Sequence, residues 1–350
     1  MKRIVITGGH FTPGLAVLDS LRKEDWEVHW IGEQKALEGQ EPRTLEYQIL
    51  PQLDVPFWSL TSVKFNRKFP FSTFFNLWRF PVALLQSLQL LSKIKPNVVL
   101  SFGSYVSLPV CLGAWFLGIP VVAHEQTAAS GLANRLVGRF AQRVAISFPS
   151  SSIDFPVEKT VLTGNPVRSS IHKVGKLRLK KRVGRPPVLY ITGGSRGSQI
   201  INRAVAEVLA ELLKTVRIYH QTGTLDFDKM QKIKNRIHPS LAGKYEVSSH
   251  YAPQEVEEIY RKADLVVSRA GANTVSELAA VGLPAIFIPI PWVEQDEQNR
   301  NAKVLANEGA AVILPQESIT GDVLLSTIKD VIRRLREFRQ NALLVQKKAL

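Results

Sequence analysis

The sequence predicts an α/β protein made of two doubly wound parallel-sheet domains, and three observations lead to this fold class. The chain has 350 residues, which suggests two domains because a domain averages about 150 residues. Short apolar strands alternate with helical patterns throughout, as in parallel α/β architectures. Both halves also begin alike, because an apolar strand runs into Thr7-Gly8-Gly9 in the first half and Thr192-Gly193-Gly194 in the second.

The predicted strands are short runs, continuous rather than alternating in polarity, as in parallel strands buried on both faces. The segment 97–123 carries no charged residue and is long enough to cross a bilayer. Pro109 and Gly113 interrupt it, so we expect a strand, a buried helix and a second strand instead. Strands are expected at 3–7, 27–31, 98–101, 120–123, 143–147 and 160–163, and at 188–192, 217–221, 245–247, 265–268, 285–289 and 311–314.

Helix signals follow the glycine turns of both halves. Thr12 is the predicted N-cap of the first helix, with Pro13 at the first helical position. An apolar stripe from Ile201 to Leu212 predicts a helix with one face in a core. Between the halves, residues 169–187 are predicted to be a linker or an exposed loop. The two domains are expected to face a central cleft, because open α/β sheets bind ligands at the carboxyl ends of their strands.

Composition excludes several classes of protein. Hydrophobic residues make up 45% of the chain and charged residues 21%, which is typical of a globular protein rather than a disordered one. Cys111 is the single cysteine, so a disulfide scaffold is excluded. The chain opens on a strand and a glycine turn, without a signal-peptide layout. The net charge of +15 suggests an anionic partner, but no DNA- or RNA-binding motif is present, so we expect no nucleic acid.

Two strand-to-helix junctions in the second half contain glycine. The segment Gly193-Gly194-Ser195-Arg196-Gly197 is neither a dinucleotide fingerprint nor a P-loop. Its backbone N–H groups and the following helix N-terminus suit a phosphate, and a tight turn without a ligand is the alternative. In the segment 268–277, Glu277 either forms a capping box with Thr274 or accepts hydrogen bonds from the two hydroxyls of a ribose.

His10 follows directly after the first glycine turn. An imidazole there can serve as a general base near neutral pH, or it can simply hydrogen-bond to the turn. No spacing of His and Cys predicts a zinc site. Asp226-Phe227-Asp228 has the pattern of a metal-binding D-x-D motif, but it lies in a polar stretch, and a solvated loop is the better interpretation.

Aromatic and basic residues are interleaved between Lys64 and Leu85. Such a mixture suits a membrane interface, because the rings reach the acyl boundary while the cations meet anionic head groups. A helix that packs its aromatic residues into the core is the alternative. The residues predicted to contact a membrane are Phe71, Phe74, Phe75, Trp78 and Arg79.

Taken together, these segments resemble the MurG family of glycosyltransferases, in order and over nearly the whole chain. Each string is weak alone, but the set is specific. The matching strings are Thr7-Gly8-Gly9-His10, Gly103-Ser104-Tyr105, His124-Glu125-Gln126, Gly131-Leu132-x-Asn134, Gly164-Asn165-Pro166-Val167-Arg168, Gly193-Gly194-Ser195-x-Gly197, Ser268-Arg269-Ala270-Gly271-Ala272-x-Thr274-Val275-x-Glu277 and Gln298-x-x-Asn301.

The resemblance implies a GT-B fold, in which two Rossmann-like domains surround the cleft. Residues 1–164 would bind the acceptor and the membrane, joined by a C-terminal helix at about 337–350, and residues 165–336 would bind the donor. It implies inverting transfer of N-acetylglucosamine from UDP-GlcNAc to the C4 hydroxyl of the muramic sugar of lipid I, without a metal or cofactor. The product is lipid II for peptidoglycan. A peripheral protein on the cytoplasmic face of the bacterial cell membrane is implied, with an anionic membrane surface and proteins of cell-wall synthesis as partners.

The resemblance also implies a role for individual residues. His10 would be the base and Glu125 the second catalytic residue, and the acceptor would meet Gly8, Gly9, His10, Tyr105 and Asn134. For the donor, the diphosphate would contact Arg168, Gly194 and Ser195, and the ribose would contact Glu277. The sugar hydroxyls would contact Gln298 and Asn301, and the uracil edge would contact the backbone of Tyr251 and Ala252. Ala270, Gly271 and Thr274 would line the same site.

Three departures from the family pattern stand out. Val5 and Ile6 occupy the positions of the first two glycines of the family's first loop, which puts the diphosphate role of that loop in doubt. Thr127 replaces an asparagine, and Glu297 precedes Gln298 where some relatives carry a second glutamine. The alternatives are a GT-B transferase for another lipid acceptor, a UDP-GlcNAc 2-epimerase, and an inactive cell-wall scaffold.

Overall fold

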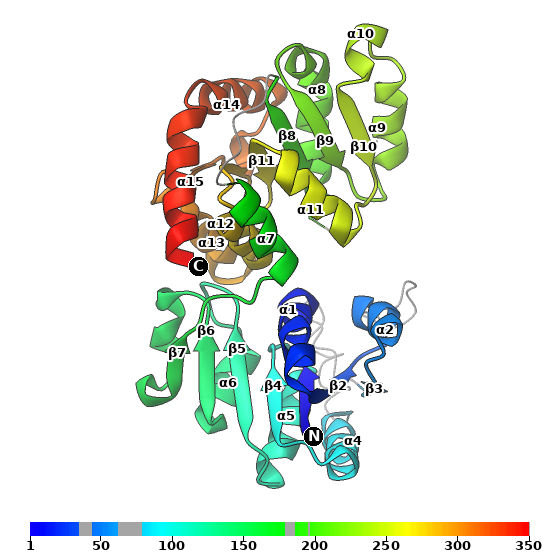
Figure 1. Ribbon diagram of the computed structural model, residues 1–350, viewed down its shortest axis with the longest axis vertical. Coiled ribbons are helices and arrows are strands. Elements are labelled where there is room, and N and C mark those ends of the chain that lie inside the picture. The colour runs from blue at the N-terminus through cyan, green and yellow to red at the C-terminus, as the bar shows by residue number, and fades with distance from the viewer. Residues whose placement is uncertain (35–43, 62–78, 179–185, 195–196, 350) are drawn as a thin grey trace. The chain divides into compact units, whose positions relative to one another are not determined.

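The chain forms two compact units, Met1–Arg168 and Ser169–Leu350 (Figure 1). The computed structural model describes residues 1–34, 44–61, 79–178, 186–194 and 197–349. Each unit contains one parallel β-sheet with helices packed on it, so the predicted α/β class and its two doubly wound sheets are confirmed.

The sheet of the first unit has seven parallel strands in the order β3-β2-β1-β4-β5-β6-β7. The order reverses between β1 and β4, and this switch point is where open α/β sheets bind ligands. The strands are β1 (Lys2–Thr7), β2 (Trp26–Gly32), β3 (Phe57–Ser59), β4 (Val98–Ser101), β5 (Val121–Glu125), β6 (Arg143–Ile146) and β7 (Thr160–Leu162).

Helices cover both faces of this sheet, because successive residues of β1 belong to different cores. Val5 packs with residues of α4 and α5 on one face, while Ile4 and Ile6 pack with Phe11 and Trp30 on the other. Such two-sided burial requires the continuous apolar strands that the sequence contains. The helices are α1 (Phe11–Leu21), α2 (Leu45–Ile49), α4 (Arg79–Ile94), α5 (Ser107–Phe116) and α6 (Leu132–Phe140).

The sheet of the second unit has six parallel strands in the order β10-β9-β8-β11-β12-β13, with its switch point between β8 and β11. The predicted apolar stripe of α8 is confirmed, since Ile201 and Leu212 are fully buried in the core. The strands are β8 (Val188–Thr192), β9 (Arg217–Gln221), β10 (Tyr245–Ser248), β11 (Leu265–Ser268), β12 (Ala285–Phe287) and β13 (Ala311–Ile313).

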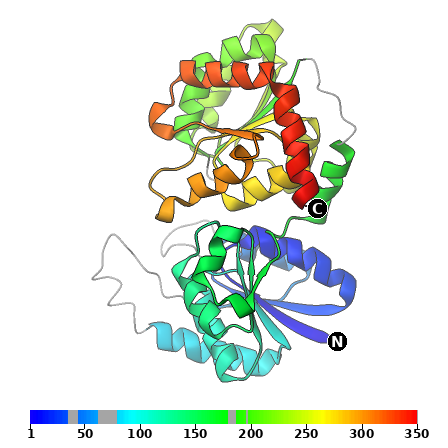
Figure 2. The same cartoon turned by 90° about the vertical axis from the view of Figure 1, so that its left-hand side faces the viewer.

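The helices of the second unit lie on both faces of its sheet, as Figures 1 and 2 show. Helices α8 and α14 pack together on the face that carries the main core, and α7 packs on α11 and α12. The helices are α7 (Ser169–Arg178), α8 (Gln199–Thr215), α9 (Phe227–Lys234), α10 (Pro239–Ala242), α11 (Pro253–Lys262), α12 (Ala272–Val281), α13 (Glu297–Ala306), α14 (Gly321–Arg333) and α15 (Leu335–Ala349).

The strands predicted from the sequence are confirmed at nearly the predicted bounds, and the short β3 is an additional edge strand. The uncharged segment 97–123 forms β4, α5 and the start of β5, as predicted. Within the described ranges, no helix is both long and apolar enough to cross a bilayer.

Two local predictions are wrong. The first helix begins at Phe11, so its N-cap is His10 and not Thr12. The predicted linker from Ser169 begins as helix α7, because Ile171 and Val174 are buried although most of their neighbours are polar. In the described residues, α15 packs mainly on α12 and α14 and also contacts α7, all of them in its own unit. The return of this last helix to the first domain therefore stays a prediction.

Candidate active site

The first glycine turn joins the ends of β1 and β4 at the switch point of the first sheet. Gly8 has a φ of +131°, and a Cβ atom there would lie 2.8 Å from the carbonyl oxygen of Gly103. The Gly9 amide donates to that same carbonyl at 3.2 Å. Val5 and Ile6 are fully buried strand residues, so the turn is restricted to the two glycines that follow Thr7.

His10 is the N-cap of α1, but its side chain makes no capping hydrogen bond. In the described residues, the His10 ring therefore does not cap the helix that it precedes. Burial lowers the pKa of His10 to about 4, because the protonated ring would lose hydration there. The imidazole is neutral at pH 7 and can accept a proton, which is what a general base requires.

His124 lies at the end of β5 and close enough to His10 for their charges to interact. Its Nε2 is 3.2 Å from the carbonyl oxygen of Gly164, which assigns the proton to Nε2. The unprotonated Nδ1 is buried and has no partner among the described residues. Burial lowers the pKa of His124 to about 4, so two neutral imidazoles lie at this edge of the sheet.

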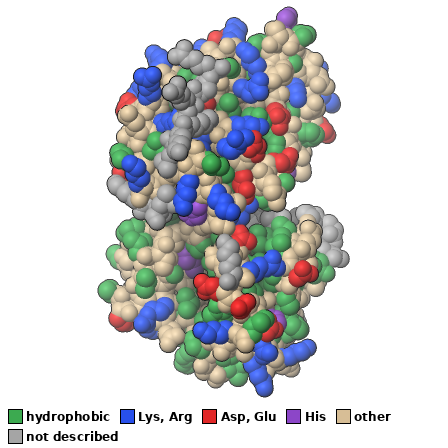
Figure 3. Space-filling model, viewed as in Figure 1, with side chains coloured by type: hydrophobic (Ala, Val, Ile, Leu, Met, Phe, Trp, Pro, Cys, Tyr) green, Lys and Arg blue, Asp and Glu red, His purple; other side chains and the backbone are tan. Residues whose placement is uncertain are grey.

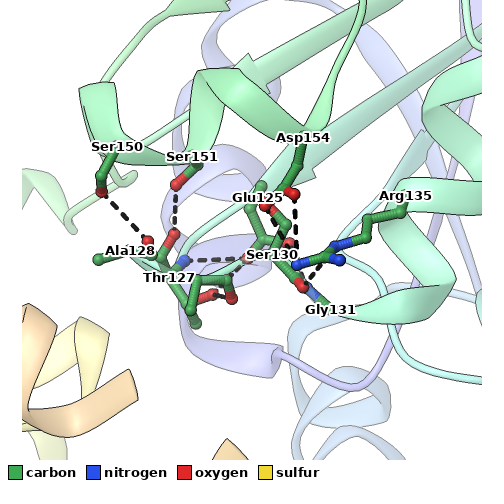
Figure 4. A network of polar contacts seen from close by, with 10 residues as sticks. Glu125, Thr127, Ala128, Ser130, Gly131, Arg135, Ser150, Ser151 and Asp154 are labelled. Atoms are coloured by element: carbon green, nitrogen blue, oxygen red, sulfur yellow. Dashed lines mark hydrogen bonds and ion pairs between the residues drawn. The ribbon is translucent and has the colours of Figure 1, made fainter. Parts of the chain in front are cut away.

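Glu125 ends β5 and is almost completely buried, and Figure 4 shows its carboxylate beside Thr127 and Gly131. Thr127 donates from its amide at 3.0 Å and from its hydroxyl at 2.7 Å to Oε1. The Gly131 amide, at 3.1 Å, and the Asn134 side-chain amide, at 3.0 Å, donate to Oε2. Both oxygens are thus occupied by the loop that they hold.

A second layer of contacts fixes the same loop. Ser151 donates to the Thr127 carbonyl at 2.7 Å and Ser150 to the Ala128 carbonyl at 3.1 Å (Figure 4). Arg135 reaches the Ser130 carbonyl and forms an ion pair with Asp154 at 3.3 Å. The segment between β5 and α6 is therefore held in one conformation by the chain that follows β6.

The two other acceptor residues predicted from the sequence lie beside these turns. The Asn134 side chain lies under Gly103, where a Cβ atom would come within 2.8 Å of Nδ2. Its Oδ1 is buried and has no partner in the described part of the chain. Tyr105 donates from its hydroxyl to Glu33 at 3.0 Å. The first unit thus brings Gly8, Gly9, His10, Glu125 and Asn134 to one edge of its sheet.

The glycine turn of the second unit is held by side chains. The Gly194 amide donates to the Thr192 hydroxyl at 3.0 Å, and its carbonyl accepts from the Gly197 amide at 3.1 Å. Gly194 has a φ of +83°, which favours glycine. Gly197 packs directly on the Thr222 carbonyl, so any side chain there would collide with backbone. Ser195, predicted to meet the diphosphate, lies outside the described residues.

Arg269, at the end of β11, contributes to the site although the sequence reasoning did not assign it a role. Its guanidinium donates at 2.8 Å to each of three oxygens: the Ser198 hydroxyl, the Ile288 carbonyl and the Gln316 side chain. Burial lowers the pKa of Arg269 to about 10, so it remains charged at pH 7. Arg269 could have been identified from the motif around it, because that motif stands at the end of a buried strand.

Glu277 is not part of a capping box. Helix α12 begins at Ala272 with Gly271 as N-cap, so Thr274 already lies inside the first turn. Instead, the hydroxyl of the buried Tyr260 donates to Oε2 of Glu277 at 3.0 Å. The Glu277 side chain is partly exposed, which a bidentate acceptor of ribose hydroxyls needs.

Gln298 and Asn301 converge on one residue of the β11–α12 junction. Oε1 of Gln298 accepts from the Ala270 amide at 3.3 Å and from the Ile290 amide at 3.0 Å. Nδ2 of Asn301 donates to the Ala270 carbonyl at 3.2 Å. The start of α13 is thereby fastened to the junction that carries Gly271 and Thr274.

The backbone predicted to meet a uracil edge is partly engaged within the protein. The Tyr251 amide donates to Oε1 of Gln221 at 3.1 Å. The Ala252 amide donates to Glu255 at 2.6 Å, and this contact starts helix α11. Arg168, also predicted for the donor, is the last residue of the first unit.

Comparison with known proteins identifies the family to which the chain belongs. The model of the glycosyltransferase family 28 N-terminal domain matches residues 6–146, and that of the C-terminal domain matches residues 188–348. The UDP-N-acetylglucosamine–N-acetylmuramyl-(pentapeptide) pyrophosphoryl-undecaprenol N-acetylglucosamine transferase of Exiguobacterium sp. is 33% identical over 338 residues, covering 95% of this chain and 90% of that protein. The enzyme of the same name from Aeromonas hydrophila is 36% identical over 315 residues, covering 90% and 82%. The chain belongs to glycosyltransferase family 28, and within it to the MurG family.

Solved structures place this MurG family member in the predicted fold class. The crystal structure of MurG from Acinetobacter baumannii superposes with a TM-score of 0.72 at 26% identity, covering 99% of this chain and 95% of that one. Two Rossmann-like parallel sheets of this kind are the GT-B fold, which is confirmed. A UDP-GlcNAc 2-epimerase from Neisseria meningitidis matches with a TM-score of 0.64 at 14% identity, covering 98% and 94%. At that identity the likeness shows the fold alone, so the epimerase alternative is not favoured.

Possible metal ligands do not gather into a site in the described ranges of this chain. In the ranges that the structure describes, no three His, Cys, Asp or Glu side chains are placed to hold a metal ion. Asp226 of the D-x-D pattern lies in the partly exposed turn before α9, as the loop interpretation predicted, and it also accepts a hydrogen bond from the buried Asn202 at 2.7 Å. The predicted membrane residues Phe71, Phe74, Phe75 and Trp78 lie outside the described residues.

Proposed function

We propose that this glycosyltransferase moves N-acetylglucosamine from UDP-GlcNAc to the C4 hydroxyl of the muramic sugar of lipid I, with inversion and without a metal. The product is lipid II for peptidoglycan. Relatives that share at least a third of the sequence over almost its whole length are named for this transfer. The observation that carries the proposal is His10, a neutral imidazole without a capping bond at the switch point of the first sheet.

His10 is the proposed base in a single in-line displacement. The C4 oxygen of the acceptor forms a bond to the anomeric carbon of GlcNAc, while the bond from that carbon to the diphosphate oxygen of UDP breaks. The proton of the C4 hydroxyl passes to the unprotonated nitrogen of His10, and UDP leaves with the bonding electron pair. With a pKa near 4, His10 stays unprotonated over the whole physiological range, so its ring has a nitrogen that can accept this proton.

The second unit is the proposed donor site. Its glycine turn and the start of α8 offer a partial positive charge to the departing diphosphate, with Arg168 as a cation. Glu277 accepts the two ribose hydroxyls while Tyr260 holds its carboxylate. Gln298 and Asn301, at the start of α13, are the proposed partners of the sugar hydroxyls, and their bonds to backbone support their positions.

Glu125 is the other residue predicted to be catalytic, and its surroundings favour a positioning role in the acceptor site. Its carboxylate already accepts four hydrogen bonds from the loop between β5 and α6. Taking a proton from a substrate would break at least one of them and leave a buried donor unpaired. We therefore assign proton transfer to His10 and loop geometry to Glu125.

An anionic membrane surface at the cytoplasmic face is the proposed location of the acceptor. Trp115, Phe116 and Leu117 at the end of α5 are 52%, 62% and 42% exposed, which is unusual for such large apolar side chains. Arg143 and Lys159 line the same hollow as Trp115. Lys and Arg are otherwise spread over both units on the face shown in Figure 3, without forming one stripe of the kind that nucleic acid would need.

Vesicle binding tests this surface. Trp115→Ser combined with Phe116→Ser should weaken binding to anionic vesicles by about tenfold, because both rings lose their contact with the acyl boundary. Trp292→Ser is the matched control, since Trp292 is 72% exposed on the second unit. Equal binding by both variants would exclude α5 as the contact.

Transfer of labelled GlcNAc from UDP-GlcNAc to a lipid I analogue, with EDTA present, tests the function itself. We expect label in the lipid product, and no transfer to a diacylglycerol acceptor. Folded protein that binds UDP but labels no lipid I analogue would contradict the proposal. Conversion of UDP-GlcNAc in the absence of any acceptor would instead support the epimerase.

A further inference from the structure

Gln221 is the last residue of β9 and lies between the two loops that the donor is proposed to contact. It is 5% exposed, so its side chain cannot rely on water for hydrogen bonds. Nε2 donates to the Gly194 carbonyl at 3.0 Å, and Oε1 accepts from the Tyr251 amide at 3.1 Å. One buried amide therefore joins the glycine turn after β8 to the loop before α11.

The hydrogen-bond partners leave one orientation for this amide. A carbonyl oxygen cannot accept from a carbonyl, and an NH₂ group cannot donate to an amide N–H, so Oε1 must face Tyr251 and Nε2 must face Gly194. Nε2 also lies 3.4 Å from the Thr192 hydroxyl oxygen. In the sheet, Thr192 and Gln221 are register partners on β8 and β9, which is why the side chain arrives at the turn.

The contact to Gly194 sets the direction of a peptide unit. In a planar trans peptide the carbonyl and the amide point in opposite directions. Holding the Gly194 carbonyl toward Gln221 therefore keeps this carbonyl off the opposite edge of the turn. Gly194 has a φ of +83°, and no described atom lies within 4 Å of the place where a Cβ atom would stand, so its carbonyl is held by two donors, Nε2 of Gln221 and the Gly197 amide at 3.1 Å.

We propose that Gln221 is a positioning residue that couples the diphosphate half of the donor site to its nucleoside half. The inference rests on the proposed function, since it takes UDP as the ligand of the second unit. Gln221 does not touch the ligand. It sets the glycine turn and the Tyr251 backbone in one mutual geometry, so that both halves of a nucleoside diphosphate are met at once.

Gln221→Glu separates the two contacts. The carboxylate still accepts from the Tyr251 amide, but its other oxygen faces the Gly194 carbonyl and repels it. At about pH 8 we expect UDP affinity to fall about tenfold, because the Gly194 carbonyl loses one of its two donors and faces a carboxylate oxygen instead, while uridine affinity changes less than about twofold. Titrations with UDP and with uridine measure both, and the ratio of the two affinities is the readout.

The pH dependence of this variant distinguishes positioning from a general loss of structure. Burial raises the pKa of a carboxyl group, and a protonated carboxyl can donate to the Gly194 carbonyl. At about pH 5.5 we therefore expect the loss of UDP affinity, relative to the wild type at the same pH, to shrink to less than about threefold. A variant that is merely less stable would lose more affinity at the lower pH.

Gln346→Glu is the matched control. Gln346 is also fully buried, and its Nε2 donates to the Ala280 carbonyl at 2.9 Å, between α15 and α12. It should leave the ratio of UDP to uridine affinity unchanged at both pH values. Gln221→Leu, which removes both contacts, should weaken UDP and uridine together and serves as the second variant if Gln221→Glu does not fold.

Specific outcomes overturn the inference. UDP and uridine affinities that fall equally in Gln221→Glu, or a UDP affinity equal to that of the wild type, would both contradict coupling through Gln221. Wild-type protein that binds UDP but labels no lipid I analogue refutes the proposed function while the coupling stands. Wild-type protein that does not bind UDP refutes both.

Discussion

The first strand of each sheet ends in the same tripeptide, Thr-Gly-Gly, yet the two turns are built differently. Thr192 accepts hydrogen bonds from the Gly194 amide and from Gln221. The Thr7 hydroxyl is buried without a partner in the described part of the chain. The difference comes from the neighbouring strand, because the register partner of Thr192 is Gln221 while that of Thr7 is Ile31.

This comparison shows that a repeated fold does not repeat its site. Next to Ile31, the first turn is held by backbone contacts, such as the Gly9 amide on the Gly103 carbonyl. That leaves His10 as the reactive group which the turn presents. Next to Gln221, the second turn is tied by a side chain to a neighbouring loop. The first unit thus presents a base, whereas the second unit holds several parts of a ligand in fixed relative positions.

The largest expected effect comes from the group that the first turn presents. His10→Ala should lower kcat by about 10²–10⁴ with little change in UDP affinity, because a general base contributes about that much. Rapid-quench transfer assays and UDP titration measure the two quantities separately. A loss confined to UDP affinity would assign His10 to the donor instead and break the comparison.

The pH dependence of kcat in the wild type also tests the role of His10 as the base. Burial lowers the pKa of His10 to about 4, and the base is active only when neutral. As far as His10 governs the rate, kcat should stay constant from about pH 8 down to about pH 5 and fall only as the pH approaches 4. An acidic limb centred near the ordinary histidine pKa of about 6.5 would indicate a solvated imidazole.

The two turns should also differ in their tolerance of a side chain. Gly8→Ala places a Cβ atom 2.8 Å from the Gly103 carbonyl at a φ of +131°, and we expect it to cost about 3 kcal/mol or more. Gly194→Ala meets no described atom within 4 Å, so only its φ of +83° costs free energy, about 1 kcal/mol. Urea unfolding of both variants measures the difference. Equal losses would mean that the backbone of β4 can move away from Gly8.

A smaller effect is expected where the second unit holds a ligand group through a side chain. Tyr260→Phe removes the hydroxyl that donates to Glu277. UDP affinity should fall about tenfold and 2′-deoxy-UDP affinity much less, because only the former offers both ribose hydroxyls. Tyr219→Phe is the control, since Tyr219 is also buried, on β9. An unchanged preference for UDP over 2′-deoxy-UDP in Tyr260→Phe would separate Tyr260 from ribose recognition.

The sequence could predict features that depend on residues close together in the chain, but not features that depend on distant residues. The strands and both glycine turns depend on local patterns, and they were predicted at nearly the observed bounds. The capping box of Thr274 and the N-cap at Thr12 were wrong, because each helix begins earlier than its polar signal indicates. Strand packing decides those starts, and a local pattern does not contain it.

The residues that hold the site were missed for the same reason. Gln221 and Arg269 each contact chain segments that are distant in sequence, as the bond from Arg269 to Ser198 shows. Nothing in a window around either residue indicates its partner. Tyr260 reads as a helix residue until α11 is placed beside α12 and its hydroxyl meets Glu277. The sequence shows that each of these residues is polar, but the direction in which its side chain points depends on the sheet.

The smallest expected effect, which is also the most direct test of the comparison, comes from a matched pair of substitutions. Thr→Val keeps the shape of the side chain and removes the hydroxyl. Thr192→Val should cost about 1–2 kcal/mol, because the Gly194 amide and Nε2 of Gln221 lose an acceptor. Thr7→Val should be neutral or slightly stabilising, because it replaces a buried hydroxyl that has no partner in the described residues.

Urea unfolding measures both changes, and the UDP affinity of Thr192→Val adds a functional readout. We expect that affinity to fall a few-fold, about 0.5–1.5 kcal/mol, since the turn keeps its bond from Gln221 to the Gly194 carbonyl. A destabilising Thr7→Val would mean that the Thr7 hydroxyl is satisfied in solution by bound water. The two turns would then both depend on a threonine, and the contrast between Ile31 and Gln221 would no longer explain why only the second is tied to its neighbour.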